Sequence, residues 1–139
     1  MQVKSFAIWA NAEKNQVPAL VQSTLKWANE NNLEVYLADR LKSIDVDSDV
    51  SYFSSHKPPE VDFLLCFGGD GTLISGVRIF SDPSVPVLGV HLGGLGFLAQ
   101  ITPEVLIEKL ECVKNNEFNI QDRLVLSAKI SGNKDSYYA

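Results

Sequence analysis

Apolar and polar residues follow one another along this chain in blocks that predict strands and helices in turn. Two short apolar runs, at 3–9 and 33–38, are typical of strands and flank a segment, 16–31, whose apolar residues recur at helical spacing. Asn15 is the expected N-cap of this helix, which should end in the asparagine-rich cluster 29–32. Strand, helix and strand in this order predict a parallel pair with a right-handed crossover.

The central pattern is an uninterrupted apolar run, 63–67, that breaks directly into glycines. Such a run is typical of a strand buried on both faces of a parallel sheet. The apolar spacing of 72–80 then predicts a helix with a buried stripe, and the turn between strand and helix consists of Gly68, Gly69, Asp70, Gly71 and Thr72. Three glycines in four positions allow positive φ and let a ligand approach the main chain. At a helix N-terminus, this turn is a candidate phosphate site.

Asp70 is the ionisable residue in this turn. A carboxylate beside a phosphate is unfavourable unless a cation screens it or a proton moves to it. In phosphoryl transfer, such a group holds Mg²⁺ or accepts the proton of the attacking hydroxyl. The alternative is an aspartate that caps its own turn.

A second glycine-rich corner, 91–98, follows a further predicted strand, 87–90. Because the carboxyl ends of parallel strands meet at one edge of a sheet, both corners should lie at the edge where open α/β sheets bind ligands. Gly94, Gly96 and Ala99 also fit a dinucleotide fingerprint, but no convincing helix follows them.

Two side chains of the second corner are candidate ligand contacts, together with the backbone at Gly93. His91 is either a ligand contact or a satisfied structural histidine, and both interpretations stay open. Phe97 is either an aromatic wall for a base or part of the core, and its residue type favours the core.

The remaining segments predict one more helix and then a change from helical spacing to the alternating pattern of strands. The segment 39–60 is polar, with room for one short helix. Thr102 is expected to cap a helix with Pro103 at its first position, which ends at 115–116; its buried stripe is Leu106, Ile107, Leu110 and Val113. Residues 124–130 alternate as a strand, Gly132 and Asn133 signal a turn, and Tyr137 and Tyr138 begin a returning strand. We therefore expect an α/β domain at 1–120 and the start of a truncated β-rich domain at 121–139.

The composition of the chain indicates which classes of partner are not expected. The chain has 139 residues, 45% of them hydrophobic, and a formal charge of −5 without a Lys/Arg cluster, so nucleic acid is not an expected partner. No stretch has membrane-spanning length and no signal peptide is evident, so no membrane partner is expected and the predicted location is cytoplasmic. Cys66 and Cys112 lack further ligands at metal spacing and are expected to be reduced thiols.

Three motifs in this order resemble the amino-terminal half of NAD kinases: GGDGT at 68–72, PVLGVHLGGLGFLA at 86–99 and DRLVLSAKI at 122–130. The resemblance implies an open, mostly parallel Rossmann-like sheet flanked by helices, of the NAD kinase and phosphofructokinase kind. It also implies ATP-dependent phosphorylation of the 2′-hydroxyl of the adenosine ribose of NAD, with Mg²⁺ or another divalent ion, in a homo-oligomer. Lipid kinases of the diacylglycerol and sphingosine type have related turns, but the Asn-Asp pair of their second corner is absent here. A non-catalytic nucleotide-binding module is the third hypothesis.

By this resemblance, Asp70 matches the general base and nucleotide contact, Gly69 and Gly71 match glycines that approach phosphate, and Phe97 matches an aromatic beside the adenine. No residue is assigned as a metal ligand. His91, Gly94 and Gln100 depart from the common pattern, which affects only the finer contacts. The family completes its NAD site with a carboxy-terminal β domain. The 139 residues alone are therefore expected to bind nucleotide weakly and to turn over poorly.

Overall fold

Five parallel strands form one open sheet in the computed structural model, which describes residues 2–47, 49–80, 84–94, 96–99, 101–132 and 136–138. The strands are β1 (Ser5–Ala10), β2 (Glu34–Ala38), β3 (Ser51–Phe53), β4 (Phe63–Gly68) and β5 (Val87–His91), in the order β3-β2-β1-β4-β5. Every strand pair in this sheet is parallel. The predicted α/β class with a parallel sheet is confirmed.

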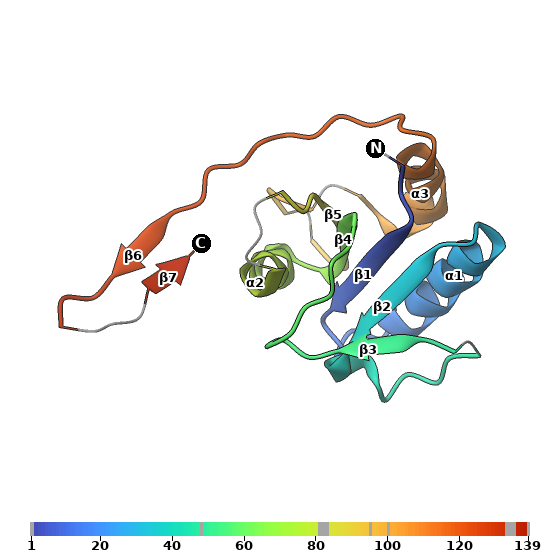
Figure 1. The fold of residues 1–139 in the computed structure, drawn as a ribbon, viewed down its shortest axis with the longest axis horizontal. Helices are drawn as coiled ribbons and strands as arrows, with labels where there is room; N and C mark the ends of the chain where they lie inside the picture. Colours follow the sequence, from blue (N-terminus) through green and yellow to red (C-terminus); the bar gives the residue numbers. More distant parts are fainter. Residues whose placement is uncertain are drawn as a thin grey trace.

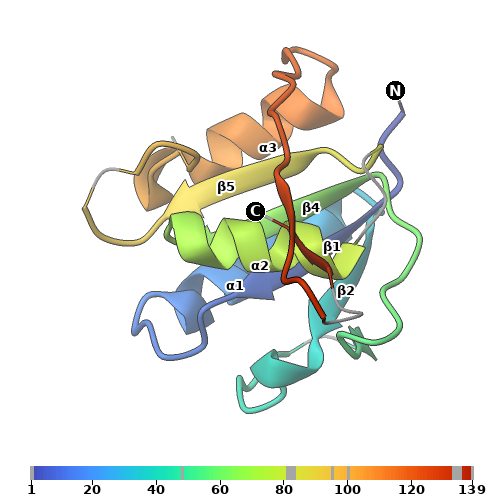
Figure 2. The ribbon, with the colours of Figure 1, turned by 90° about the vertical axis from the view of Figure 1, so that its left-hand side faces the viewer.

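Helices cover both faces of the sheet (Figure 1). Helices α1 (Val17–Glu30) and α3 (Leu106–Lys114) lie on one side and α2 (Asp70–Phe80) on the other. Side chains alternate between the faces of β1. Phe6 therefore packs against Trp27 of α1, with ring centroids 6.4 Å apart, whereas Trp9 donates from Nε1 to Ser75 Oγ of α2 at 2.9 Å. In Figure 2, α2 lies in front of the sheet.

Several details of the predicted elements were wrong. The segment 39–60 contains the 3₁₀ helix η1 (Asp39–Leu41), and also β3, a strand of three residues that the sequence did not reveal. Gln16, not Asn15, precedes the first turn of α1, and no side-chain hydrogen bond caps it. Pro103 opens a 3₁₀ helix, η2 (Pro103–Val105), before α3. Ile107 is 39% exposed, so the buried stripe of α3 is Leu106, Leu110 and Val113.

Other boundaries agree with the sequence. Helix α1 ends beside Asn32 and α3 beside Asn116, two non-glycine residues with positive φ of 55° and 58°, a conformation that asparagine tolerates. Cys66 is buried and Cys112 is partly buried, and both are free thiols. Within the described ranges, no helix has both the length and the apolarity needed to cross a bilayer.

The last part of the chain leaves the sheet. After α3 an extended segment leads to a separate two-stranded antiparallel sheet of β6 (Ser127–Lys129) and β7 (Ser136–Tyr138) (Figure 1). Apolar side chains of the extended segment are uncovered, and Leu124 is 84% exposed. The predicted hairpin is confirmed in outline, although its strands are shorter than expected and Asn133 lies outside the described residues. The domain boundary at residue 120 stays a prediction.

Candidate functional site

The first glycine corner joins β4 to α2. Helix α2 begins at Asp70, two residues earlier than predicted, because the carbonyl oxygen of Gly69 accepts the N–H groups of Thr72 and Leu73 at 3.0 and 3.2 Å. The first N–H groups of a helix have no intrahelical acceptor and point out of its positive end. This corner therefore presents backbone donors at the carboxyl end of β4.

The glycines of this corner are needed for space rather than for unusual dihedral angles. None of Gly68, Gly69 and Gly71 has a positive φ, so that expectation was wrong. A Cβ at Gly68 would collide with the Thr72 hydroxyl and lie 2.6 Å from its Cβ. At Gly69 and Gly71, a Cβ would meet nothing within 4 Å. A side chain there would extend into the open space above the turn, which the two glycines keep free.

The two corners lie at the same edge of the sheet, as predicted. Gly68 and His91 are register partners in β4 and β5, and the Leu92 N–H donates to the Gly68 carbonyl at 2.9 Å. Gly93 adopts a φ of +149°, which favours glycine, as the chain turns away from β5. The chain then returns beside β5, where Ile101 forms a bridge with Val90.

Asp70 ties the second corner to the first. Its carboxylate accepts the backbone N–H groups of Phe97 at 2.9 Å, Leu98 at 3.0 Å and Ala99 at 3.4 Å. Gly96 lies against the same carboxylate, since a Cβ there would collide with Oδ1 and lie 3.0 Å from Cγ. Asp70 therefore does more than cap its own turn, because its partners lie 27 to 29 residues along the chain.

The three donors also set the charge state of Asp70. The hydrogen bonds from the Phe97 and Leu98 N–H groups lower the pKa of this carboxyl, so it is ionised at neutral pH. A carboxylate offers about four acceptor positions, and backbone donors fill three of them. With the described residues as its only partners, the partly exposed Asp70 has about one position left for a hydroxyl or a cation.

Phe97 and His91 differ from their expected environments. Phe97 is 90% exposed, so the core packing that its residue type favoured is wrong, and the ring is free to stack on a flat ligand. The Nδ1 atom of His91 is buried and has no hydrogen-bond partner among the described residues, so this nitrogen is not satisfied by a structural contact. Leu95 and Gln100 lie outside the described residues. Ligand contacts for all the predicted site residues stay predictions.

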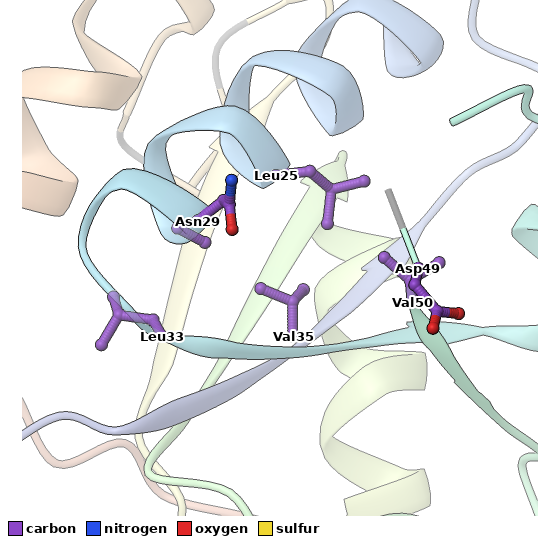
Figure 3. A pocket seen from close by; sticks show the side chains of 7 residues that line it. Leu25, Asn29, Leu33, Val35, Asp49 and Val50 are labelled. Atoms are coloured by element: carbon purple, nitrogen blue, oxygen red, sulfur yellow. The ribbon is translucent and has the colours of Figure 1, made fainter. Parts of the chain in front are cut away.

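The cavities lie away from this edge. One of about 90 Å³ lies between α1 and the amino end of β2, lined by residues that include Leu25, Asn29 and Val35 (Figure 3). A larger one of about 470 Å³ lies at the amino ends of β4 and β5, beside Pro59 and Pro86. Neither of these two cavities is lined by a residue of the glycine corners. Among the described residues, no cluster of three His, Cys, Asp or Glu side chains can hold a metal ion.

Sequence reasoning missed the partners of Asp70. It placed the two corners together but did not foresee that Gly96 makes room for the carboxylate, or that the N–H groups of 97–99 bind it. The Gly-Phe pair at 96–97 is the only trace of this in the sequence, since backbone donors carry no residue signature. The dinucleotide fingerprint is not supported, because the described part of 93–99 contains no helix.

A parallel sheet with two glycine corners at its carboxyl edge defines an α/β domain of the class that binds nucleotides at that edge. The family model for the ATP-NAD kinase N-terminal domain matches residues 6–118, and the chain belongs to this family. The lipid-kinase alternative is therefore not favoured.

Curated relatives and solved structures agree. An NAD kinase of Syntrophotalea carbinolica is 36% identical over 128 residues, which cover 92% of this chain and 45% of the relative. An NAD kinase of Sulfurimonas denitrificans is 47% identical over 75 residues, 54% of this chain and 26% of the relative. A yeast NADH kinase complexed with NADH has the same fold, with a TM-score of 0.77 at 18% identity, covering 99% of this chain and 46% of that one.

An NAD kinase from Archaeoglobus fulgidus in complex with ATP gives a TM-score of 0.54, also at 18% identity, over 88% of this chain and 39% of that chain. At such identity, both solved structures bear on the fold alone. The chain spans about half the length of the first relatives that it matches.

Proposed function

We propose that this chain is the α/β half of an ATP-dependent NAD kinase, which phosphorylates the 2′-hydroxyl of the adenosine ribose of NAD to give NADP. The observation that carries the proposal is the Asp70 carboxylate, which two glycine corners hold at the ligand edge with one acceptor position unfilled. The family membership and the curated NAD kinases support the same reaction.

In this proposal Asp70 accepts a hydrogen bond from the ribose hydroxyl and takes its proton as the hydroxyl attacks the terminal phosphate. Its lowered pKa keeps it in the acceptor form at neutral pH but makes it a weak base. Its main contribution is therefore to orient the hydroxyl. The backbone of Gly69, Gly71 and Thr72 lies against the phosphates, and His91 and Gly93 border the nucleotide. The exposed Phe97 ring stacks on the adenine.

A divalent ion belongs to this reaction as part of the substrate. Mg²⁺ commonly binds through nucleotide phosphates and one or two carboxylates. Asp70 is mostly occupied by N–H donors, and no described cluster builds a protein cage. The ion therefore arrives with the ATP phosphates, and no step is assigned to it here. A cytoplasmic location and a homo-oligomeric complete protein are further parts of the proposal.

The test is an assay of protein that contains this chain with ATP, Mg²⁺ and NAD, in which NADP is measured by an NADP-specific coupled enzyme. We expect NADP from a reading frame of the length of the relatives and little or none from the 139 residues alone. Comparable rates for both would refute the need for a second half. Replacing ATP by polyphosphate, and NAD by NADH, in the same assay identifies the donor and the acceptor.

Parallel reactions with a diacylglycerol and a sphingoid base as acceptors test the lipid-kinase alternative, because lipid kinases have a related glycine turn. A phosphorylated lipid without NADP would overturn the proposal. Tight binding of ATP or NAD by the longer protein, without product from any acceptor, would favour a non-catalytic nucleotide-binding module instead.

A further inference from the structure

We propose that Arg40 binds the polyphosphate chain of the phosphoryl donor. Sequence reasoning did not single out this residue, and the inference rests on the proposed function. Arg40 lies in η1, which follows β2 at the carboxyl edge of the sheet. Three observations carry the proposal: its place at the carboxyl edge of the sheet, the platform that holds its guanidinium, and the absence of a described acidic partner.

Arg40 and the first glycine corner lie at the same edge of the sheet. Leu37 of β2 pairs with Ile8 of β1, which pairs with Leu65 of β4. β2 then ends at Ala38 and η1 carries Arg40 just beyond it, while β4 ends at Gly68, so both residues lie at the carboxyl ends of their strands. Strands β2 and β4 are separated by β1 alone, so they are about 10 Å apart. This spacing is within the reach of a long side chain and an extended triphosphate.

The Arg40 side chain reaches a residue of the neighbouring strand. Its guanidinium carbon lies 4.8 Å from the ring centroid of Trp9, which belongs to β1, the strand next to β4. Cations favour this position over an indole face. The charged group is therefore held against a side chain of β1, the strand that lies between β2 and β4.

Trp9 is itself fixed to the helix that carries the corner. Its Nε1–H donates to Ser75 Oγ at 2.9 Å, and that hydroxyl donates to the Thr72 carbonyl at 2.8 Å. Thr72 closes the glycine turn and belongs to the first turn of α2. A fixed platform reduces the conformational freedom that Arg40 would lose on binding a ligand.

The guanidinium is free to bind an anion. Arg40 is exposed and forms no ion pair with any described carboxylate, while the neighbouring Asp39 pairs with Lys42 at 2.7 Å. Arginine matches phosphate oxygens with two parallel N–H donors. A chain of net charge −5, with an ionised Asp70 at its ligand edge, needs such a cation to bind a polyphosphate.

The test measures binding of inorganic tripolyphosphate and of ATP by calorimetry to protein of the length of the relatives, with the chain unmodified and with Arg40→Gln. We expect Arg40→Gln to weaken binding of both by at least about 10-fold, as loss of a charge-assisted contact implies. Arg40→Lys keeps the charge without the planar group and should lie between. Lys26→Gln removes an exposed cation from α1, on the other face of the sheet, and should leave both affinities unchanged.

A second readout follows Trp9 directly. Its indole N–H resonance, assigned with Trp9→Phe, should shift when tripolyphosphate is added to the unmodified chain and shift less in Arg40→Gln. NAD without a donor should leave it in place. Circular dichroism checks that each variant is folded.

Equal affinities of the unmodified chain and Arg40→Gln would overturn the proposal, and so would the absence of tripolyphosphate and ATP binding by the unmodified chain. The NADP assay tests the proposed function separately. NADP formation with an unchanged Michaelis constant for ATP in Arg40→Gln removes this role of Arg40 and leaves the NAD kinase intact. Failure to form NADP from any donor removes the proposed function, whatever Arg40 binds.

Discussion

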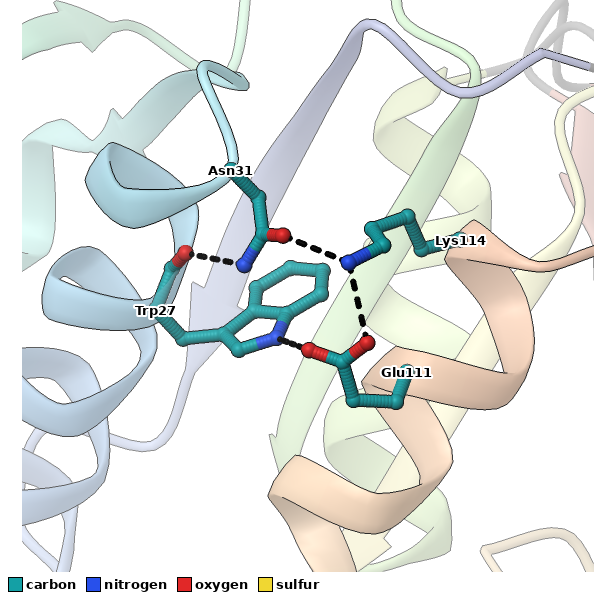
Figure 4. Close-up of polar contacts among 4 residues, drawn as sticks. All are labelled: Trp27, Asn31, Glu111 and Lys114. Carbon is teal, nitrogen blue, oxygen red and sulfur yellow. Dashed lines mark hydrogen bonds and ion pairs between the residues drawn. The ribbon is translucent and has the colours of Figure 1, made fainter.

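Asp70 and Glu111, two of the carboxylates that join distant parts of this chain, use different kinds of donor. Asp70, at the carboxyl edge of the sheet, accepts three backbone N–H groups from 97–99. Glu111 of α3 accepts the indole N–H of Trp27 from α1 at 2.6 Å and pairs with Lys114 at 3.0 Å (Figure 4). Hydrogen bonds lower the pKa of both carboxyls. The largest contribution comes from the Phe97 N–H for Asp70 and from the Trp27 indole N–H for Glu111.

The difference lies in the partners of each carboxylate and in its place in the fold. The Glu111 network closes on itself, because Lys114 also donates to Asn31 Oδ1 at 2.6 Å and Asn31 Nδ2 donates to the Trp27 carbonyl at 2.8 Å. It joins two helices far from the glycine corners. Asp70 instead lies at the carboxyl edge of the sheet, bound by backbone donors of the second corner. The same chemical group thus acts as a helix clamp in one place and as a candidate site in the other.

The largest effect should come from Asp70→Asn. In the protein that forms NADP, we expect kcat to fall by about 10²-fold, as loss of the orientation of a reacting group implies. Glu111→Gln is the matched control and should change kcat less than twofold in folded protein. The measurement is the initial rate at saturating ATP and NAD. Unchanged turnover in Asp70→Asn would contradict its catalytic role and would leave Asp70, like Glu111, with a structural role only.

Gly96→Ala tests the Asp70 contact without changing any charge. A methyl group there would collide with the Asp70 carboxylate, so the backbone or the aspartate must shift. We expect a loss of about 1–3 kcal/mol in the free energy of unfolding, typical of overpacking, together with slower NADP formation. The control is Gly94→Ala, where a Cβ meets nothing within 4 Å; it should change stability by less than about 0.5 kcal/mol. Equal denaturation midpoints for the two variants would contradict the packing.

Gly76→Ala tests how α2 holds Asp70 in place. Alanine improves helix propensity by about 1 kcal/mol, but the new Cβ would lie 3.0 Å from Trp9 Cδ1 and 3.1 Å from Cys66 Sγ and Leu64 Cδ2. Overpacking of about 1–3 kcal/mol should exceed that gain and leave the variant about 1 kcal/mol less stable in urea. A more stable Gly76→Ala would show that α2 moves easily on the sheet.

The pattern of apolar residues and glycines in the sequence predicted much of the fold but only part of the site. The uninterrupted 63–67 run and the two glycine corners predicted the sheet and its ligand edge, because buried strands and glycine turns are local signals. The strand β3 was missed because three residues carry too little periodicity. Phe97 was misplaced because residue type alone does not report that a chain turns outward.

Backbone donors and cross-chain stacks have no local signature. The N–H groups that bind Asp70 and the Arg40–Trp9 stack depend on tertiary placement, which the sequence did not show. Gly96 was noticed only as part of an alternative fingerprint, although its role is to leave space for a carboxylate.

The smallest effect concerns pH. A carboxyl with a lowered pKa in the folded protein stabilises the fold fully above its unfolded value, and this contribution is lost as the pH falls through the folded value. For Glu111 the ordinary value is 4.5, so the stability difference between the unmodified chain and Glu111→Gln should be constant at neutral pH. It should shrink as urea unfolding is followed from pH 7 to about pH 3.

The ordinary pKa of Asp70 is 3.8, and its pKa is also lowered in the folded protein. The stability difference between the unmodified chain and Asp70→Asn should therefore also shrink as the pH falls, but at a lower pH. Addition of ATP should distinguish the pH dependence of the two carboxyls. ATP should change the pH dependence that belongs to Asp70, since it binds beside that carboxylate, and leave that of Glu111 unchanged. A Glu111→Gln difference that does not vary with pH would mean that its ion pair and indole contact do not stabilise the fold. An ATP effect on Glu111 alone would move the nucleotide away from the glycine corners.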